Sequence, residues 1–263
     1  MSDGGVLEGL RIGCVRYLNS KPLIYGLEGV RLEHPSRLAQ ELRDGELDVA
    51  LVPVFELLRA PGEYIAVDGV GVTSDGPVYS VFVAHREPIE VVESILVDPA
   101  SLTSVHLLQV LFKGVIGRKA PLVEMKEEGR RGDMARLLIG NQAIAFRNGE
   151  GKEGWNYWDL GAVWKAWTGL PFVYALWVMR KGLRDPIAIA REFQRIARVG
   201  ESRIDEIAQE DEEVAASVAR EYLRDFIGFA VGGREHLGLI RFREELLSAG
   251  FLGDGEKVIE FVS

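Results

Sequence analysis

The sequence predicts an α/β protein with two lobes, and three observations support this expectation. Strand-like and helical segments alternate through the first two thirds of the 263 residues. Two long apolar strands, Val78–His85 and Phe172–Met179, bracket an almost complete α/β unit of about 90 residues, which is small for a domain but within range. From Asp185 onward the pattern is helical alone.

The first third of the chain alternates strand and helix. Strands are expected at Ile12–Val15 and Asp48–Val52, and helical segments at Pro22–Gly26, Ser36–Arg43 and Val54–Arg59. Gly45 ends the second of these helices, and a strand follows at once, which is how a βαβ layer is built.

The middle of the chain continues the alternation after the strand Val78–His85. The pattern predicts a strand over Val91–Val97, a helix from Ser101 or Thr103 to Phe112, a strand over Leu122–Met125, a helix over Met134–Leu138 and a strand over Gln142–Phe146. Asn148–Asp159 is rich in polar breakers and predicts a surface loop whose aromatic side chains turn inward.

The last third begins with Asp185-Pro186, an N-cap followed by proline at the first helical position. Further helices are expected near Ile204–Gln209, Glu213–Phe226 and Arg234–Ala249. A chain that leaves one lobe by a long strand and returns by another leaves a cleft between the lobes. We therefore expect residues 1–82 and 184–263 to form lobe I, with the helical tail packed on it, and residues 83–183 to form lobe II.

Charge and apolar patterning exclude several classes of protein. The formal charge is −9, with 40 acidic and 31 basic residues and no basic stripe, which argues against nucleic acid or an anionic membrane as the main partner. No run of about 18 apolar residues is present, so no membrane span is expected. The N-terminal residues lack the features of a secretory signal, which predicts a cytoplasmic protein. The oligomeric state has no signature in the sequence.

Cofactor motifs are incomplete. Gly149-Glu150-Gly151-Lys152 lacks the spacing of a phosphate loop, and Gly69-Val70-Gly71 lacks the third glycine of a dinucleotide fingerprint. The four histidines show no two-histidine helical spacing, and the single cysteine, Cys14, lies in a strand-like run where a buried thiol acts as a small hydrophobe. The sequence thus indicates neither a metal nor a nucleotide cofactor.

Three strand-like apolar runs each end in a turn of small polar residues, namely Arg11–Val15, Val70–Val72 and Ile95–Val97. In open α/β sheets ligands bind where strands end. The third turn holds Ser101, Thr103 and Ser104 at a helix start, whose free N–H groups and dipole suit a carboxylate or phosphate. Plain capping would need only one of these hydroxyls. His106 follows in the same helix and is either a general base or a packed histidine.

The other two turns have both a structural and a functional interpretation. Asn19 and Ser20 precede a proline and fit an ordinary turn as well as a pocket wall. The run from Ser74 through Asp75 to Gly76 is likewise a strong turn sequence. Ser80 interrupts an apolar strand at the expected lobe crossing, where a small hydroxyl either faces the cleft or acts as a packing spacer.

Four ordered motifs resemble the chorismate dehydratase family, which opens the futalosine route to menaquinone. They are Arg11-Ile12-Gly13-Cys14-Val15-Arg16-Tyr17-Leu18-Asn19-Ser20-Lys21-Pro22-Leu23, Gly45-Glu46-Leu47-Asp48-Val49-Ala50-Leu51-Val52-Pro53, Ser74-Asp75-Gly76-Pro77-Val78-Tyr79-Ser80-Val81 and Asp98-Pro99-Ala100-Ser101-Leu102-Thr103-Ser104. The resemblance continues to about Trp177. It implies a two-lobed clamshell like the type II periplasmic binding proteins, with mixed sheets, helices on both faces and the active site in the cleft.

The resemblance also implies a reaction and a set of site residues. Water would be lost from chorismate, without a cofactor, to give 3-[(1-carboxyvinyl)oxy]benzoate. On the matching positions, Asn19 and Ser80 would be the polar groups nearest the ring, and Ser101, Thr103 and Ser104 would hold a carboxylate. From the chemistry of the elimination we expect Asn19 and Ser80 to orient and polarise the ring hydroxyl as the catalytic pair. We also expect Ser20, Ser74, Asp75, Gly76 and Asn141 to bind the substrate. Asn141 stands where relatives often have Asp, which leaves its role open.

Three other functions share these features. A solute-binding protein would use the same clamshell only to capture a small carboxylate, although the missing signal and lipidated cysteine weigh against it. A lyase that splits a cyclic futalosine derivative would be expected to present a histidine base, for which only His106 is a candidate. The last alternative is a ligand-sensing domain, but no DNA-binding segment accompanies it.

Overall fold

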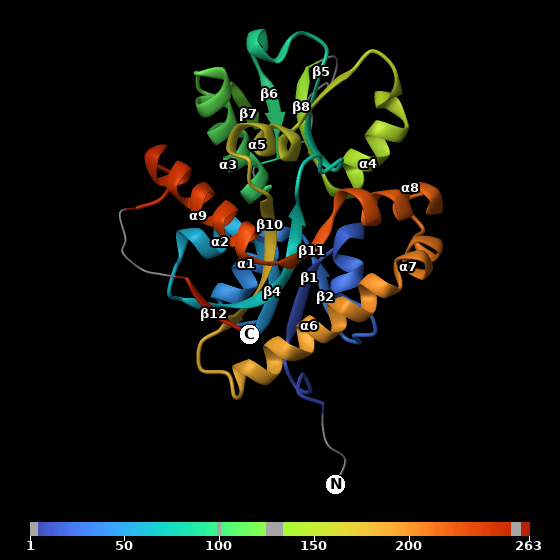
Figure 1. The fold of residues 1–263 in the computed structure, drawn as a ribbon, viewed down its shortest axis with the longest axis vertical. Coiled ribbons are helices and arrows are strands. Elements are labelled where there is room, and N and C mark those ends of the chain that lie inside the picture. Colours follow the sequence, from blue (N-terminus) through green and yellow to red (C-terminus); the bar gives the residue numbers. More distant parts are fainter. Residues whose placement is uncertain (1–4, 99–100, 125–133, 254–258) are drawn as a thin grey trace.

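The computed structural model describes residues 5–98, 101–124, 134–253 and 259–263. In these ranges two β-sheets lie one above the other, with helices against both (Figure 1). The first sheet has the order β11 (Gly228–Val231), β4 (Tyr64–Ser74), β10 (Phe172–Arg180), β3 (Val49–Pro53), β1 (Ile12–Val15) and β2 (Arg31–Glu33), and β12 (Glu260–Val262) also pairs with β4. β1 is parallel to its neighbours and β10 is antiparallel to both of its own, so the sheet is mixed.

The second sheet is also mixed. Its order is β7 (Leu122–Glu124), β6 (Ile95–Val97), β8 (Ala135–Ile139), β5 (Val81–His85) and β9 (Asn156–Asp159). β6 runs parallel to β7 and β8, whereas β5 is antiparallel to β8 and β9. The α/β architecture with mixed sheets predicted by the sequence is therefore confirmed.

The helices divide between the two sheets in Figure 1. Those beside the first sheet are α1 (Pro35–Arg43), α2 (Val54–Arg59), α6 (Pro186–Ser202), α7 (Ile204–Glu210), α8 (Ala216–Glu221) and α9 (Gly233–Ser248). Those beside the second are α3 (Leu102–Leu111), α4 (Gly140–Asn148) and α5 (Leu160–Thr168). Short 3-10 turns add η1 (Leu18–Ile24), η2 (Ile89–Val91) and η4 (Glu150–Lys152), and π-helical turns add η3 (Phe112–Ile116) and η5 (Tyr222–Phe226). No helix in the described ranges is both long and apolar enough to cross a bilayer.

Two predicted elements exchange their types. Residues 135–139 form the strand β8 where a helix was expected, and residues 140–148 form the helix α4 where a strand was expected. β8 lies between β6 and β5, and the burial of its first three residues in succession, Arg136 included, shows no alternation of buried and exposed positions. Short apolar runs of this kind do not distinguish strand from helix by periodicity.

The tail is not helical alone, because β11 and β12 both pair with β4. β4 itself is 11 residues long, whereas the sequence indicated a strand only at Val70–Val72. In the expected loop Asn148–Asp159, the last four residues form the edge strand β9. These strands are short or lie at sheet edges, so pairing with a longer neighbour determines them more than their own sequence does.

Sheet membership and the expected lobe boundaries do not coincide. β10 lies between β4 and β3 of the first sheet, although residues 83–183 were assigned to the second lobe. β5 lies wholly in the second sheet and starts at Val81. In the tail, α6 packs on η1 and β4 as expected, but α9 also contacts α3 beside the second sheet. The chain thus crosses between the sheets after β4 and again before β10.

Candidate functional site

A cavity that is partly open to solvent lies where the two sheets meet. Its walls come from the ends of β1 and β10, from η1, from the segment between β4 and β5, and from the start of α3. Of the predicted site residues, it brings together Asn19, Ser80, Ser101, Thr103 and Ser104. Four of these five side chains carry a neutral hydroxyl, and the fifth, Asn19, carries an amide.

The start of α3 contributes hydroxyl groups with different roles. Thr103 Oγ1 accepts a hydrogen bond from Phe55 N at 3.1 Å, which ties α3 to α2. Ser101 precedes the helix without a side-chain capping bond, and among the described residues neither its hydroxyl nor that of Ser104 has a hydrogen-bond partner. Ser101 and Ser104 therefore offer free hydroxyls to the cavity beside the N–H groups of a helix N-terminus.

Asn19 and Ser80 meet through a third side chain that the sequence did not indicate. Tyr222 Oη lies 2.7 Å from Ser80 Oγ and accepts a hydrogen bond from Asn19 Nδ2 at 3.0 Å. Tyr222 is the first residue of η5 in the C-terminal third of the chain. Its sequence neighbourhood is an ordinary helical pattern, so no local signal marks it as part of the site.

The position of Ser80 depends on an unusual backbone at Tyr79. Tyr79 has a φ of 65°, which is rare for a bulky residue and costs on the order of 1–3 kcal/mol. The Asp159 carboxylate compensates, because it accepts hydrogen bonds from the N–H groups of Val78 at 3.0 Å and Tyr79 at 2.9 Å. The Arg147 guanidinium also lies 4.3 Å from the centre of the Tyr79 ring. Ser80 is thus held in place by its neighbours.

Several predicted binding residues hold turns and do not line the cavity. Ser20 Oγ lies 2.7 Å from the carbonyl oxygens of both Val15 and Tyr17, which closes the turn after β1. Ser74 Oγ lies 3.1 Å from Tyr174 Oη and donates to the Gly76 carbonyl at 3.2 Å. Both serines act on the cavity only through the backbone and through Tyr174, which does line it.

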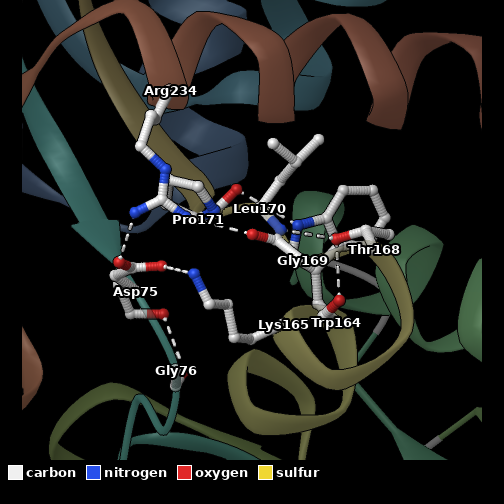
Figure 2. Close-up of polar contacts among 10 residues, drawn as sticks. Asp75, Gly76, Trp164, Lys165, Thr168, Gly169, Leu170, Pro171 and Arg234 are labelled. Atoms are coloured by element: carbon white, nitrogen blue, oxygen red, sulfur yellow. Dashed lines mark hydrogen bonds and ion pairs between the residues drawn. The ribbon is translucent and has the colours of Figure 1, made fainter.

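Asp75 belongs to an ion-pair cluster away from the cavity (Figure 2). Its carboxylate is paired with Lys165 Nζ of α5 and, at 3.0 Å, with Arg234 Nη1 of α9. Arg234 also donates to the Gly169 carbonyl at 3.0 Å. The cluster joins the end of β4 to a helix of the second sheet and to the C-terminal helix. Neither Asp75 nor Gly76 lines the cavity, so their contact with a ligand stays a prediction.

Asn141 is also outside the cavity lining. Its Oδ1 accepts a hydrogen bond from Leu18 N at 2.9 Å, and its Nδ2 donates to Glu213 at 2.5 Å. An aspartate at this position lacks a donor for Glu213 and places two carboxylates together. The amide therefore fits a link between η1, α4 and the C-terminal segment.

His106, the candidate general base, and Cys14, the single cysteine, are both packed inside the protein. His106 Nδ1 lies 2.7 Å from the Leu102 carbonyl, the ring stacks on Phe55 at 3.6 Å, and burial lowers its pKa. Cys14 is fully buried, and burial raises its pKa to about 12, so its thiol stays protonated at neutral pH. Neither residue lines the cavity. Within the described ranges there is also no cluster of three or more metal-ligating side chains.

A second, partly open cavity adjoins the first and shares Tyr17, Pro35, Ser101 and Ile139 with it; we call the first the inner cavity and the second the outer cavity. The outer cavity carries the charged residues Arg16, Glu33 and Asp98, which the inner cavity lacks, and also the imidazole of His34. His34 Nε2 lies 3.8 Å from Asp98 Oδ2, so one residue before α1 meets one residue after β6 across this space. The described residues that line the inner cavity are therefore neutral, and several of those that line the outer cavity are charged.

Comparison with known proteins matches this arrangement to one family. A family model described as menaquinone biosynthesis matches residues 10–246. The chain belongs to this menaquinone biosynthesis family. A curated relative, the chorismate dehydratase of Thermus thermophilus, is 29% identical over 262 residues that cover 89% of this chain and 94% of the relative.

Solved structures support the fold of this family member. The protein AF1704 from Archaeoglobus fulgidus superposes with a TM-score of 0.74 at 16% identity and covers 92% of this chain and 98% of its own. The Candida albicans CA3427 gene product, described as having the generic periplasmic binding protein fold, gives a TM-score of 0.61 at 12% identity, with 94% and 92% covered. The periplasmic aliphatic sulphonate binding protein SsuA of Escherichia coli gives 0.63 at 14% identity, with 92% and 88% covered.

The Asp159 contacts give a first prediction. Asp159→Asn is expected to lower the free energy of unfolding by about 2 kcal/mol, because one amide oxygen replaces a buried carboxylate that accepts from three N–H groups. Asp185→Asn is the matched control. Asp185 also caps a helix, through Ala188 N, but holds no crossing segment, so its loss is expected to stay below about 0.5 kcal/mol. Urea unfolding measures both values, and equal losses would contradict this role of Asp159.

Proposed function

We propose that this protein is a chorismate dehydratase, a hydro-lyase that eliminates water from chorismate to give 3-[(1-carboxyvinyl)oxy]benzoate without a cofactor. The observation that carries the proposal is the uncharged lining of the inner cavity, which includes Asn19, Ser80 and the hydroxyls of Ser101 and Ser104 among apolar side chains. The 29% identical relative that bears this activity's name, over 89% of the chain, supports the same conclusion.

We expect each of the two cavities to hold one of the two carboxylates of chorismate. One carboxylate is expected at the start of α3. There the Ser101 and Ser104 hydroxyls can donate hydrogen bonds to it, and the helix N-terminus adds N–H groups. The other is expected in the outer cavity, near Arg16 and His34. An acidic protein can bind such a dianion in this way because the attraction is local.

The elimination needs positioning more than strong acids and bases, since it produces an aromatic ring. The bond from C4 to the hydroxyl breaks, the proton on C3 leaves, and the electron pair of the C3–H bond completes the aromatic system. Ser80 is placed to donate a hydrogen bond to the departing hydroxyl, and Asn19 Oδ1 is placed to accept from it. These two side chains are the proposed catalytic groups.

The cavity offers no side chain to take the proton from C3. None of the described residues that line it is an Asp, Glu, His, Lys or Arg. We therefore assign the proton to a carboxylate of the substrate or to a water molecule. This assignment also accounts for the absence of a charged residue from the predicted catalytic pair.

Incubation of the purified protein with chorismate tests the proposal directly. The expected result is the aromatic product, followed by ultraviolet absorbance and mass spectrometry, in protein treated with a chelator and dialysed. Asn19→Ala and Ser80→Ala are each expected to lower kcat about 10-fold or more and to change KM less than about threefold, because the lost hydrogen bonds act on the leaving group.

Two outcomes would count against this function. Binding of chorismate without any product would favour the alternative of a solute-binding protein for small carboxylates, since the fold serves both. Unchanged turnover in both Asn19→Ala and Ser80→Ala would remove these residues from the chemistry even if product forms.

The hydroxyls of α3 generate a separate prediction for substrate binding. Ser101→Ala and Ser104→Ala are each expected to raise KM for chorismate by about 10-fold, the equivalent of one hydrogen bond to a charged group. Thr73→Val is the matched control, because the Thr73 hydroxyl donates to the Gly228 carbonyl and Thr73 does not line the cavity. This control is expected to lower the unfolding temperature more than it raises KM. A larger KM effect from Thr73→Val than from both serine variants would contradict the assignment.

A further inference from the structure

Tyr222 occupies a buried position beneath the two proposed catalytic side chains. It is 1% exposed, and its Oη lies 2.7 Å from Ser80 Oγ and 3.0 Å from Asn19 Nδ2. Tyr222 is not among the described residues that line the cavity. The phenol therefore contacts the groups that meet the substrate without meeting it.

The hydrogen-bonding capacity of the three groups fixes the direction of each bond. Asn19 Nδ2 is a donor, so Tyr222 Oη accepts from it. The phenol still has one hydrogen to donate, and among the described residues Ser80 Oγ is its only other partner. If Ser80 donated to Tyr222 instead, a buried phenol hydrogen would be left unpaired, at a cost of about 1–3 kcal/mol. Tyr222 thus donates to Ser80.

This direction leaves the hydroxyl hydrogen of Ser80 free. Ser80 Oγ has no second hydrogen-bond partner among the described residues, and Ser80 lines the cavity. A hydroxyl that already accepts one hydrogen bond is also a better donor, because linked hydrogen bonds polarise one another. The same phenol holds the Asn19 amide nitrogen, which leaves Asn19 Oδ1 as the end available to accept.

We propose that Tyr222 is a positioning residue that sets Ser80 as a hydrogen-bond donor and Asn19 as an acceptor toward the substrate hydroxyl. This inference rests on the proposed function for the chemistry, but the hydrogen-bond directions stand on the structure alone. Tyr222 acts through Ser80 and Asn19 and is not itself a catalytic residue.

The surroundings of Tyr222 suit a fixed donor and not a proton source. Burial raises the pKa of its phenol well above the ordinary value, so the hydroxyl keeps its hydrogen at any working pH. The segment that carries Tyr222 is fastened at its start, since Lys21 Nζ lies 2.8 Å from Asp211 and Asn141 donates to Glu213. These contacts tie the C-terminal segment to η1 and to α4.

Removing only the phenol oxygen tests the proposal. Tyr222→Phe is expected to lower kcat about 10-fold with KM changed less than about threefold, because the donor is misdirected while the cavity keeps its shape. Tyr64→Phe is the matched control. Tyr64 is also buried and bonded to a side chain, Glu56, but lies outside the cavity lining, so its kcat is expected to stay within about twofold of the parent.

A double variant separates positioning from a general structural effect. In the Ser80→Ala background, Tyr222→Phe is expected to lower kcat by less than about threefold, because one of the two groups that Tyr222 orients, the Ser80 hydroxyl, is already absent and only the Asn19 contact remains to be lost. A full repeat of the single-variant loss in that background would overturn the proposal. So would an unchanged kcat in Tyr222→Phe, or a loss confined to KM and thermal stability.

Neutron diffraction on deuterated crystals gives a readout that does not depend on turnover. The expected result places the deuterium of Tyr222 toward Ser80 Oγ and that of Ser80 toward the cavity. A Ser80 deuterium directed at Tyr222 would overturn the inference. If the parent protein leaves chorismate unchanged, the proposed function fails, and this measurement still decides the role of Tyr222.

Discussion

The Asp159 carboxylate holds the segment that joins the two sheets. It accepts from the N–H groups of Val78 and Tyr79 in that segment and from Ala162 at the start of α5. One buried carboxylate therefore fixes the crossing after β4 to a helix of the second sheet. Tyr79 adopts its left-handed backbone under this constraint, and Ser80 reaches the cavity as a result. The geometry of the proposed catalytic pair depends on this interaction.

None of the described residues that line the inner cavity is charged. Asp75 is bound by Lys165 and Arg234, as Figure 2 shows, and Asp211 is bound by Lys21. What faces the cavity is a set of hydroxyls, one amide and apolar side chains. A dianionic substrate brings its own charges into such a site, and hydrogen-bond donors are sufficient to hold it. Because this lining has no side chain that could accept the C3 proton, we assign the role of base to a carboxylate of the substrate or to a water molecule.

The sequence predicted the fold class and the cavity better than it predicted individual contacts. Polar turns after strands predicted Asn19, Ser101, Thr103 and Ser104, because ligands in open α/β sheets bind at strand ends, and a hydroxyl inside an apolar strand predicted Ser80. Ser20, Ser74, Asp75, Gly76 and Asn141 follow the same pattern but hold turns or join elements. Which hydroxyl of a polar turn is free depends on its partners, and those lie far away in the sequence.

The residues that position the site could not be predicted from the sequence around them. Asp159 and Tyr222 act over separations of 81 and 142 residues from Val78 and Ser80, so no nearby pattern marks them. The exchanged types of β8 and α4 have a related cause, since burial on both faces removes the alternation that distinguishes a strand. Edge strands such as β11 and β12 are determined by pairing with β4.

A crystal structure of the Ser80→Ala variant with chorismate bound tests the central claim most directly. One carboxylate of chorismate is expected within about 3 Å of the Ser101 and Ser104 hydroxyls. The C4 hydroxyl is expected to point at Asn19 and at the space that the Ser80 oxygen occupies in the parent protein. Chorismate bound outside this cavity, or held in it with the C4 hydroxyl turned away from both positions, would contradict the account.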